Sequence, residues 1–117
     1  MRVTAFTRAL DLVTRVRGVR GAMVVAQADG LIVAEQLMEG IKGSAVAALA
    51  ANLAGRLQRA MVAAGLWPSQ FWHLQCDLGA LLVVPAGERL LVVAVTEPEV
   101  NVGLVRLELL RAAEVAG

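Results

Sequence analysis

The most uniform pattern along the chain is a run of small apolar residues at positions 44–54, which contains no charged side chain. Helical character continues to position 64, with Ser44 placed to cap the helix and with Gly65 and Pro68 placed to end it. A surface helix normally keeps a polar face opposite its apolar stripe, whereas a helix that is apolar all round must be covered on every side. One domain can cover one side with its own sheet, so the pattern predicts a protein partner on the other side.

Periodicity predicts the remaining elements. Apolar residues recur at helical spacing between positions 6 and 16, and again in a third helix at 100–115, where Pro98 takes the first helical position. Alternating or continuous apolar runs predict five strands, at 19–27, 31–37, 70–77, 79–84 and 89–96. The first two strands are joined by Asp29 and Gly30, a pair that tolerates positive φ at both central positions of a tight turn.

The predicted order of elements is α-β-β-α-β-β-β-α. The first, fourth and fifth strands are apolar on both faces, so helices are expected on both sides of the sheet. The fold class is therefore α/β, in the broad sense that includes α+β. It is a three-layer α/β/α sandwich around a five-stranded, mostly antiparallel sheet, and a single domain is expected over residues 1–117.

The third strand differs from the others because apolar and polar residues alternate along it. Trp72, Leu74 and Cys76 alternate with His73 and Gln75, so only one face is expected to be dry. This alternation predicts a strand at the edge of the sheet. The strand contains no lysine or proline that would discourage pairing, so we expect it to pair with the same strand of a second copy.

Composition narrows the classes of function. The apolar fraction is 58%, above the roughly 45 to 50% of soluble domains, which also suggests a surface covered by a partner. The longest uncharged run is interrupted by polar residues and is too short to span a membrane. Eleven basic and ten acidic residues nearly cancel, which argues against nucleic acid as a partner. The single cysteine and the absence of a secretion signal indicate a cytoplasmic protein.

The residues suited to catalysis are few, and no enzyme, cofactor or metal site is expected. The glycine-rich segment at 40–44 lacks the spacing of a phosphate-binding loop. His73 and Cys76 lie three apart on a strand, so their side chains point to opposite faces and cannot form a dyad. We expect His73 to be partly exposed or at an interface, and Cys76 to be a small buried hydrophobic residue.

Three stretches resemble the roadblock family, which includes the roadblock-type dynein light chains and the bacterial Mgl partner of Ras-like GTPases. They are residues 18–31, the alanine-rich helix at 45–64, and residues 101–108. The resemblance implies a dimer, either of identical chains or with a relative, in which the second helices pack together and the third strands join two sheets. It also implies a role as a platform or regulator for a small GTPase.

On this basis we predict which residues meet the second copy and which meet the GTPase. The dimer interface is expected to include Ala47, Ala50, Ala51, Leu53, Ala54, Leu57, Phe71, His73 and Gln75. The candidates for binding the partner form the polar end of the second helix and its surroundings, namely Asn52, Arg56, Gln58, Arg59 and Trp67. The two arginines either flank the dimer and contact an acidic switch region of a GTPase, or only keep the helix end in water.

Two alternatives remain open. One is a ligand-sensing domain with a profilin-like fold, which would have a polar cavity between sheet and helix around His73. The other is an architectural scaffold subunit whose partner is another adaptor.

Overall fold

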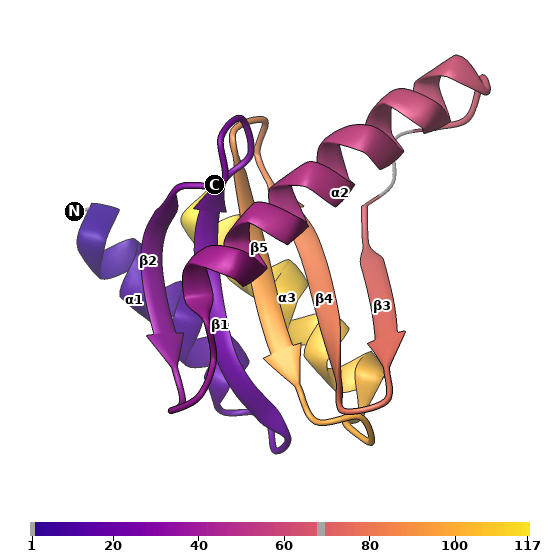
Figure 1. The fold of residues 1–117 in the computed structure, drawn as a ribbon. Helices are drawn as coiled ribbons and strands as arrows, with labels where there is room; N and C mark the ends of the chain where they lie inside the picture. The colour runs from indigo at the N-terminus through magenta and orange to yellow at the C-terminus, as the bar shows by residue number, and fades with distance from the viewer. Residues whose placement is uncertain (1, 68–69) are drawn as a thin grey trace.

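The structure is a computed structural model that describes residues 2–67 and 70–117. Eight elements follow one another along the chain (Figure 1), namely α1 (Arg2–Thr14), β1 (Val19–Ala26), β2 (Ile32–Leu37), α2 (Gly43–Ala63), β3 (Trp72–Cys76), β4 (Gly79–Ala86), β5 (Leu90–Thr96) and α3 (Val102–Ala116). The order of helices and strands is the predicted one.

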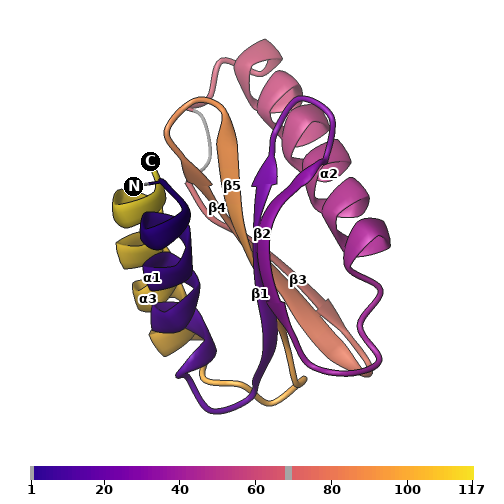
Figure 2. The same cartoon turned by 90° about the vertical axis from the view of Figure 1, so that its left-hand side faces the viewer.

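The sheet has five strands in the order β2-β1-β5-β4-β3, and every neighbouring pair is antiparallel. Figure 2 shows three layers, with α1 and α3 on one face of the sheet and α2 alone on the other. The predicted three-layer sandwich is therefore confirmed. The prediction that β3 lies at an edge is also confirmed, because β3 pairs only with β4.

The two faces of the sheet are packed by side chains of different size. On one face, large residues such as Leu10 of α1 and Leu109 of α3 are almost completely buried against the sheet. On the other face, α2 contributes only alanines to the buried cluster, over strand residues that include Met23 and Leu91. Small side chains allow the helix to approach the sheet closely, so α2 is held over a narrow strip of its surface.

The β1–β2 hairpin is present, but its turn differs from the predicted one. Gly30 has a φ of 73°, whereas Asp29 does not have a positive φ, so only one central residue is left-handed. The amide of Gly30 donates to the carbonyl of Ala26 at 2.9 Å, and the Asp29 carboxylate accepts from the amide of Leu31 at 3.1 Å. The loop between β1 and β2 is longer than the predicted two-residue turn, and it satisfies these backbone groups without forcing Asp29 into the left-handed region.

Two predicted helix starts are corrected. α2 begins at Gly43, so the capping position is Lys42, two residues before the predicted Ser44, and no side chain caps it. α3 begins after Asn101, whose side-chain oxygen accepts from the amide of Leu104 at 3.0 Å, so Pro98 lies before the helix. The predicted stop at Gly65 is confirmed by its φ of 76° and by the bond from the amide of Leu66 to the carbonyl of Met61. Pro68 lies outside the described residues.

Gly79, at the start of β4, is predicted to be intolerant of a side chain. A Cβ atom there would lie 2.6 Å from the carbonyl oxygen of Thr96, a backbone atom that cannot move without disturbing β5. We expect Gly79→Ala to lower the free energy of unfolding by about 1–3 kcal/mol, measured by denaturant titration. Gly103→Ala in α3 is the control, because its Cβ would meet nothing closer than 3.6 Å. A loss of stability no larger than that of the control would contradict the prediction.

Candidate interaction surface

The helix α2 has a covered half and a projecting half. Its buried residues end at Ala54, although the helix continues to Ala63. Figure 1 shows α2 crossing the sheet diagonally and extending beyond it on the side of β3. Since only the first half rests on the sheet, the two long edges of the helix and its projecting end form the surface available to other molecules.

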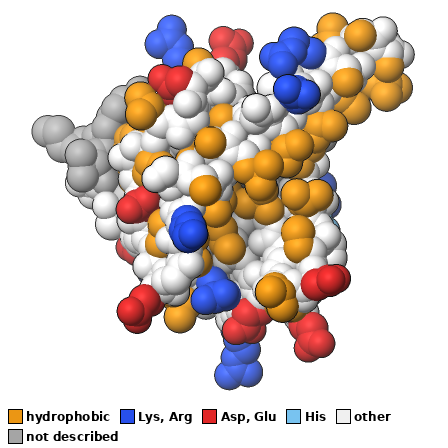
Figure 3. Space-filling view, in the orientation of Figure 1, with side chains coloured by type: hydrophobic (Ala, Val, Ile, Leu, Met, Phe, Trp, Pro, Cys, Tyr) orange, Lys and Arg blue, Asp and Glu red, His pale blue; other side chains and the backbone are white. Residues whose placement is uncertain are grey.

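The edge of α2 that faces β3 is apolar. Leu53 and Leu57 lie four apart on this edge, and Leu49, one turn before Leu53, continues the apolar stripe on the exposed side of the helix; Leu49 and Leu57 are 47% and 41% exposed. A groove of about 260 Å³ runs between this edge and the outer strands, lined by Ala50, Leu53, Ala54, Leu57, Trp72, His73, Leu74, Leu81 and Val83. Figure 3 shows the hydrophobic side chains that gather along α2 and beside it. Such an exposed apolar strip is typical of a protein interface.

Strand β3 adds an open sheet edge beside this groove. Its five residues are exposed or only half-buried, and its outer edge pairs with no strand of the described chain. An edge strand with free backbone donors and acceptors can pair with a strand from another chain. The groove and the open edge therefore lie next to each other on one side of the molecule.

Four of the residues predicted at the dimer interface lie in the core of the subunit itself. Ala47, Ala50, Ala51 and Ala54 are at most 9% exposed because they pack against the sheet. The sequence pattern could not distinguish the covered face of an alanine-rich helix from its free face. Ala50 and Ala54 line the floor of the surface groove from the core, whereas Leu53 and Leu57 are the larger predicted interface residues of α2 that line it with substantial exposure.

The three predicted interface residues around β3 lie in a polar and aromatic setting. Phe71 is half-buried, and the guanidinium carbon of Arg106 lies 5.4 Å from its ring centre. His73 is exposed, with its Nε2 atom 2.9 Å from the side-chain oxygen of Gln75, and Gln75 in turn donates to the carbonyl of Pro98 at 3.1 Å. Pairing of β3 with β4 places His73 and Gln75 at the edge of the sheet, and these contacts link their exposed side chains.

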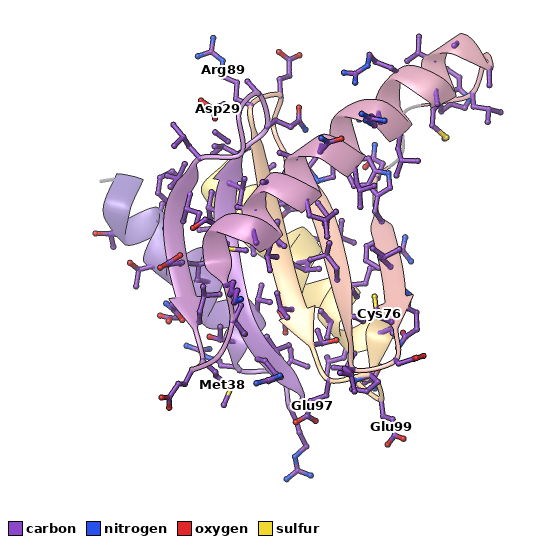
Figure 4. The ribbon with its side chains drawn as sticks, viewed as in Figure 1. Asp29, Met38, Cys76, Arg89, Glu97 and Glu99 are labelled. Carbon is purple, nitrogen blue, oxygen red and sulfur yellow. The ribbon has the colours of Figure 1, made fainter. Side chains whose placement is uncertain are left out.

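The opposite edge of α2 is polar and forms one wall of a second groove. This groove, of about 920 Å³, lies between α2 and the turns that follow β1 and β4. Asn52, Arg56 and Arg59 line it from the helix, and Asp29, Glu88 and Arg89 are among the residues that line it from the turns. Figure 4 shows Asp29 and Arg89 at the tips of the two hairpins, on the same side of the molecule.

The structure separates the five candidates for partner binding. Asn52, Arg56 and Arg59 come together in this groove, whereas Gln58 faces another depression beside α3. Trp67 is 88% exposed beyond the end of α2. Sequence reasoning missed the contribution of the turns, because it depends on how the two hairpin tips meet the helix. It also missed Gly55, although an isolated glycine within a helical pattern is a signal of a packing or functional reason.

The groups suited to catalysis remain dispersed. Cys76 is exposed, so the prediction that it is buried was wrong; it lies on the edge strand, where no layer covers it. Within residues 2–67 and 70–117, no group of three or more His, Cys, Asp or Glu side chains could hold a metal ion. The groove beside His73 is apolar and not the polar cavity that a ligand-sensing domain would need. Of the helices in the described residues, none has the length and hydrophobicity to cross a membrane.

Comparison with known proteins places these features among related folds. Residues 6–96 match the Roadblock/LC7 domain. A protein of Methanocaldococcus jannaschii is 36% identical over 107 residues, which cover 92% of each chain. Among solved structures, MglB with a tetrameric arrangement has a TM-score of 0.88 at 25% identity, covering 99% of this chain and 88% of the other. The gliding protein MglB of Thermus thermophilus has a TM-score of 0.86 at 24% identity with the same coverage.

Proposed function

We propose, on the premise that this chain belongs to the Roadblock/LC7 domain family, that it is a homodimeric adaptor or regulator that binds a Ras-like small GTPase in the cytoplasm. The family generally consists of adaptors and regulators and not of enzymes. The chain acts as a single domain without chemistry of its own. Its function is to present surfaces to a second copy and to the GTPase.

The observation that carries this proposal is the apolar groove lined by Leu53 and Leu57 beside the open edge of β3. If two β3 strands pair antiparallel about a twofold axis normal to the sheet, the two α2 helices come to lie on the same face of one continuous sheet. The projecting half of each α2 then crosses toward the partner subunit, because it already extends beyond β3 (Figure 1). This arrangement covers the apolar groove of both copies.

The GTPase is assigned to the polar edge of α2, which the proposed dimer leaves free. Asn52, Arg56 and Arg59 lie there. Gln58, beside α3, and Trp67, beyond the end of the helix, are candidates for further contacts outside this edge. The resemblance to Mgl-type partners of Ras-like GTPases supports this assignment, as do the two MglB structures of similar fold. Arginine is favoured at protein interfaces because its planar fork binds carboxylates with two hydrogen bonds.

Sedimentation velocity and a pull-down together test the proposal. The protein is expected to sediment as a dimer at micromolar concentration, and to retain a Ras-like GTPase from its own organism in one nucleotide state more than in the other. A stable monomer would remove the basis of the dimer. A dimer that retains the GTPase in neither nucleotide state would favour the scaffold alternative and overturn the GTPase assignment.

A further inference from the structure

We propose that the groove between the polar edge of α2 and the hairpin tips binds an extended acidic segment of a partner protein, with Arg59, positioned over Gly55, as its main carboxylate ligand. The identification of that partner with a GTPase rests on the proposed function. The binding chemistry itself rests on three features of the groove, which are its charges, the position of Arg59 and the composition of its two walls.

The first feature is the set of uncompensated arginines. Arg56, Arg59 and Arg89 line the groove, and in the described parts of the chain none of them forms an ion pair within 4.0 Å. The helix wall contains no acidic residue at all, because α2 has none along its whole length. The guanidinium groups of Arg56 and Arg59 on the helix wall therefore keep their hydrogen-bonding capacity for a ligand.

The second feature is the close fit of Arg59 on Gly55. A Cβ atom at Gly55 would lie 3.3 Å from one terminal guanidinium nitrogen of Arg59 and 3.9 Å from the other. The guanidinium therefore lies along the bare backbone one turn before its own position. Glycine within a helix is costly relative to alanine, by about 1 kcal/mol. The benefit that offsets this cost in our proposal is that the missing side chain leaves room for the guanidinium to lie along the helix at the wall of the groove.

The third feature is the difference between the two walls, which selects the class of ligand. The turn wall carries the carboxylates of Asp29 and Glu88 together with Arg89, opposite a helix wall whose charged groups are arginines alone. A nucleic acid, charged on all sides, would be repelled by these carboxylates, and the net charge of the chain is only +1. A peptide can direct its carboxylates toward α2 and offer backbone amide groups to the turn wall. The open groove of about 920 Å³ accommodates such a segment along its length.

Fluorescence anisotropy with a labelled peptide of alternating glutamate and serine tests the proposal, with a matched peptide of glutamine and serine. The full chain is expected to bind the acidic peptide and not the neutral one. Arg59→Gln is expected to weaken binding about threefold to fivefold, as for the loss of one exposed ion pair. Arg8→Gln is the control, because Arg8 is exposed on α1 at the opposite face of the sheet, and it is expected to leave binding unchanged.

Gly55→Ala separates positioning from folding. The added methyl group displaces the flexible end of Arg59, so peptide binding is expected to weaken about twofold or more. Alanine also favours the helix, so the melting temperature is expected to stay the same or to rise by a few degrees. A structural role for Gly55 alone would instead lower the melting temperature.

Equal binding of the two peptides, or equal losses in Arg59→Gln and Arg8→Gln, would overturn the proposal. Failure of the proposed function would be distinguishable from this outcome. If the acidic peptide binds as expected and no GTPase is retained, the groove stands and only the GTPase assignment falls. If the GTPase is retained equally by wild type and Arg59→Gln and the acidic peptide does not bind, only the groove proposal falls.

Discussion

Replacing Leu57 by glutamate is expected to convert the proposed dimer into monomers at micromolar concentration. The side chain lies in the apolar groove between α2 and β3, and the dimer would bury it. An unpaired carboxylate in that position costs several kcal/mol of association free energy. A loss of about 3 kcal/mol raises the dissociation constant about a hundredfold, which sedimentation equilibrium would detect.

Two control variants make this result specific. Leu104→Glu introduces the same charge on α3, at a side chain that is 42% exposed compared with 41% for Leu57, and it is expected to leave the dimer intact. Arg56→Glu is expected to keep the dimer and to weaken retention of the GTPase, because Arg56 lies in the polar groove.

A second variant tests the same interface. Leu53→Glu is expected to dissociate or unfold the protein, since Leu53 is half-buried. If both Leu57→Glu and Leu53→Glu sediment as dimers, as wild type is expected to do, the dimer interface lies elsewhere.

Leu91→Ala is expected to lower the free energy of unfolding by about 2–5 kcal/mol. Leu91 of β5 is completely buried under α2, in the cluster that contains the helix alanines. Truncation removes apolar contacts and leaves a cavity, because small alanine side chains above it cannot fill the space. Leu78→Ala is the matched control: Leu78 is 90% exposed in the turn after β3, and its truncation should change stability by no more than about 0.5 kcal/mol.

Denaturant titration would measure this effect. If the dimer forms as proposed, the unfolding midpoint of wild type rises with protein concentration, so wild type and the two variants are compared at the same concentration. Equal stability losses in Leu91→Ala and Leu78→Ala would contradict the assignment of Leu91 to the core. A loss confined to Leu91→Ala supports the packing of α2 on this face of the sheet.

Hydrophobic periodicity by itself determined the order of elements, the two-sided burial of β1, β4 and β5, and the edge position of β3. These are properties of contiguous segments, because a strand covered on both faces is apolar at every position, and an edge strand alternates. The ends of the helices were less well determined. The choice between Ser44 and Lys42, or between Pro98 and Asn101, depends on where the chain leaves the preceding loop.

The tertiary structure decided which face of α2 is free and which residues share a groove. An alanine-rich helix has little periodic contrast, so the sequence marked α2 as an interaction helix without orienting it. Packing on the sheet turned Ala47, Ala50, Ala51 and Ala54 inward and left Leu53 and Leu57 at the groove. Arg59 and the hairpin tips line the same groove although they are far apart in sequence. Such contacts are set by the crossing of helix and sheet, which no local pattern specifies.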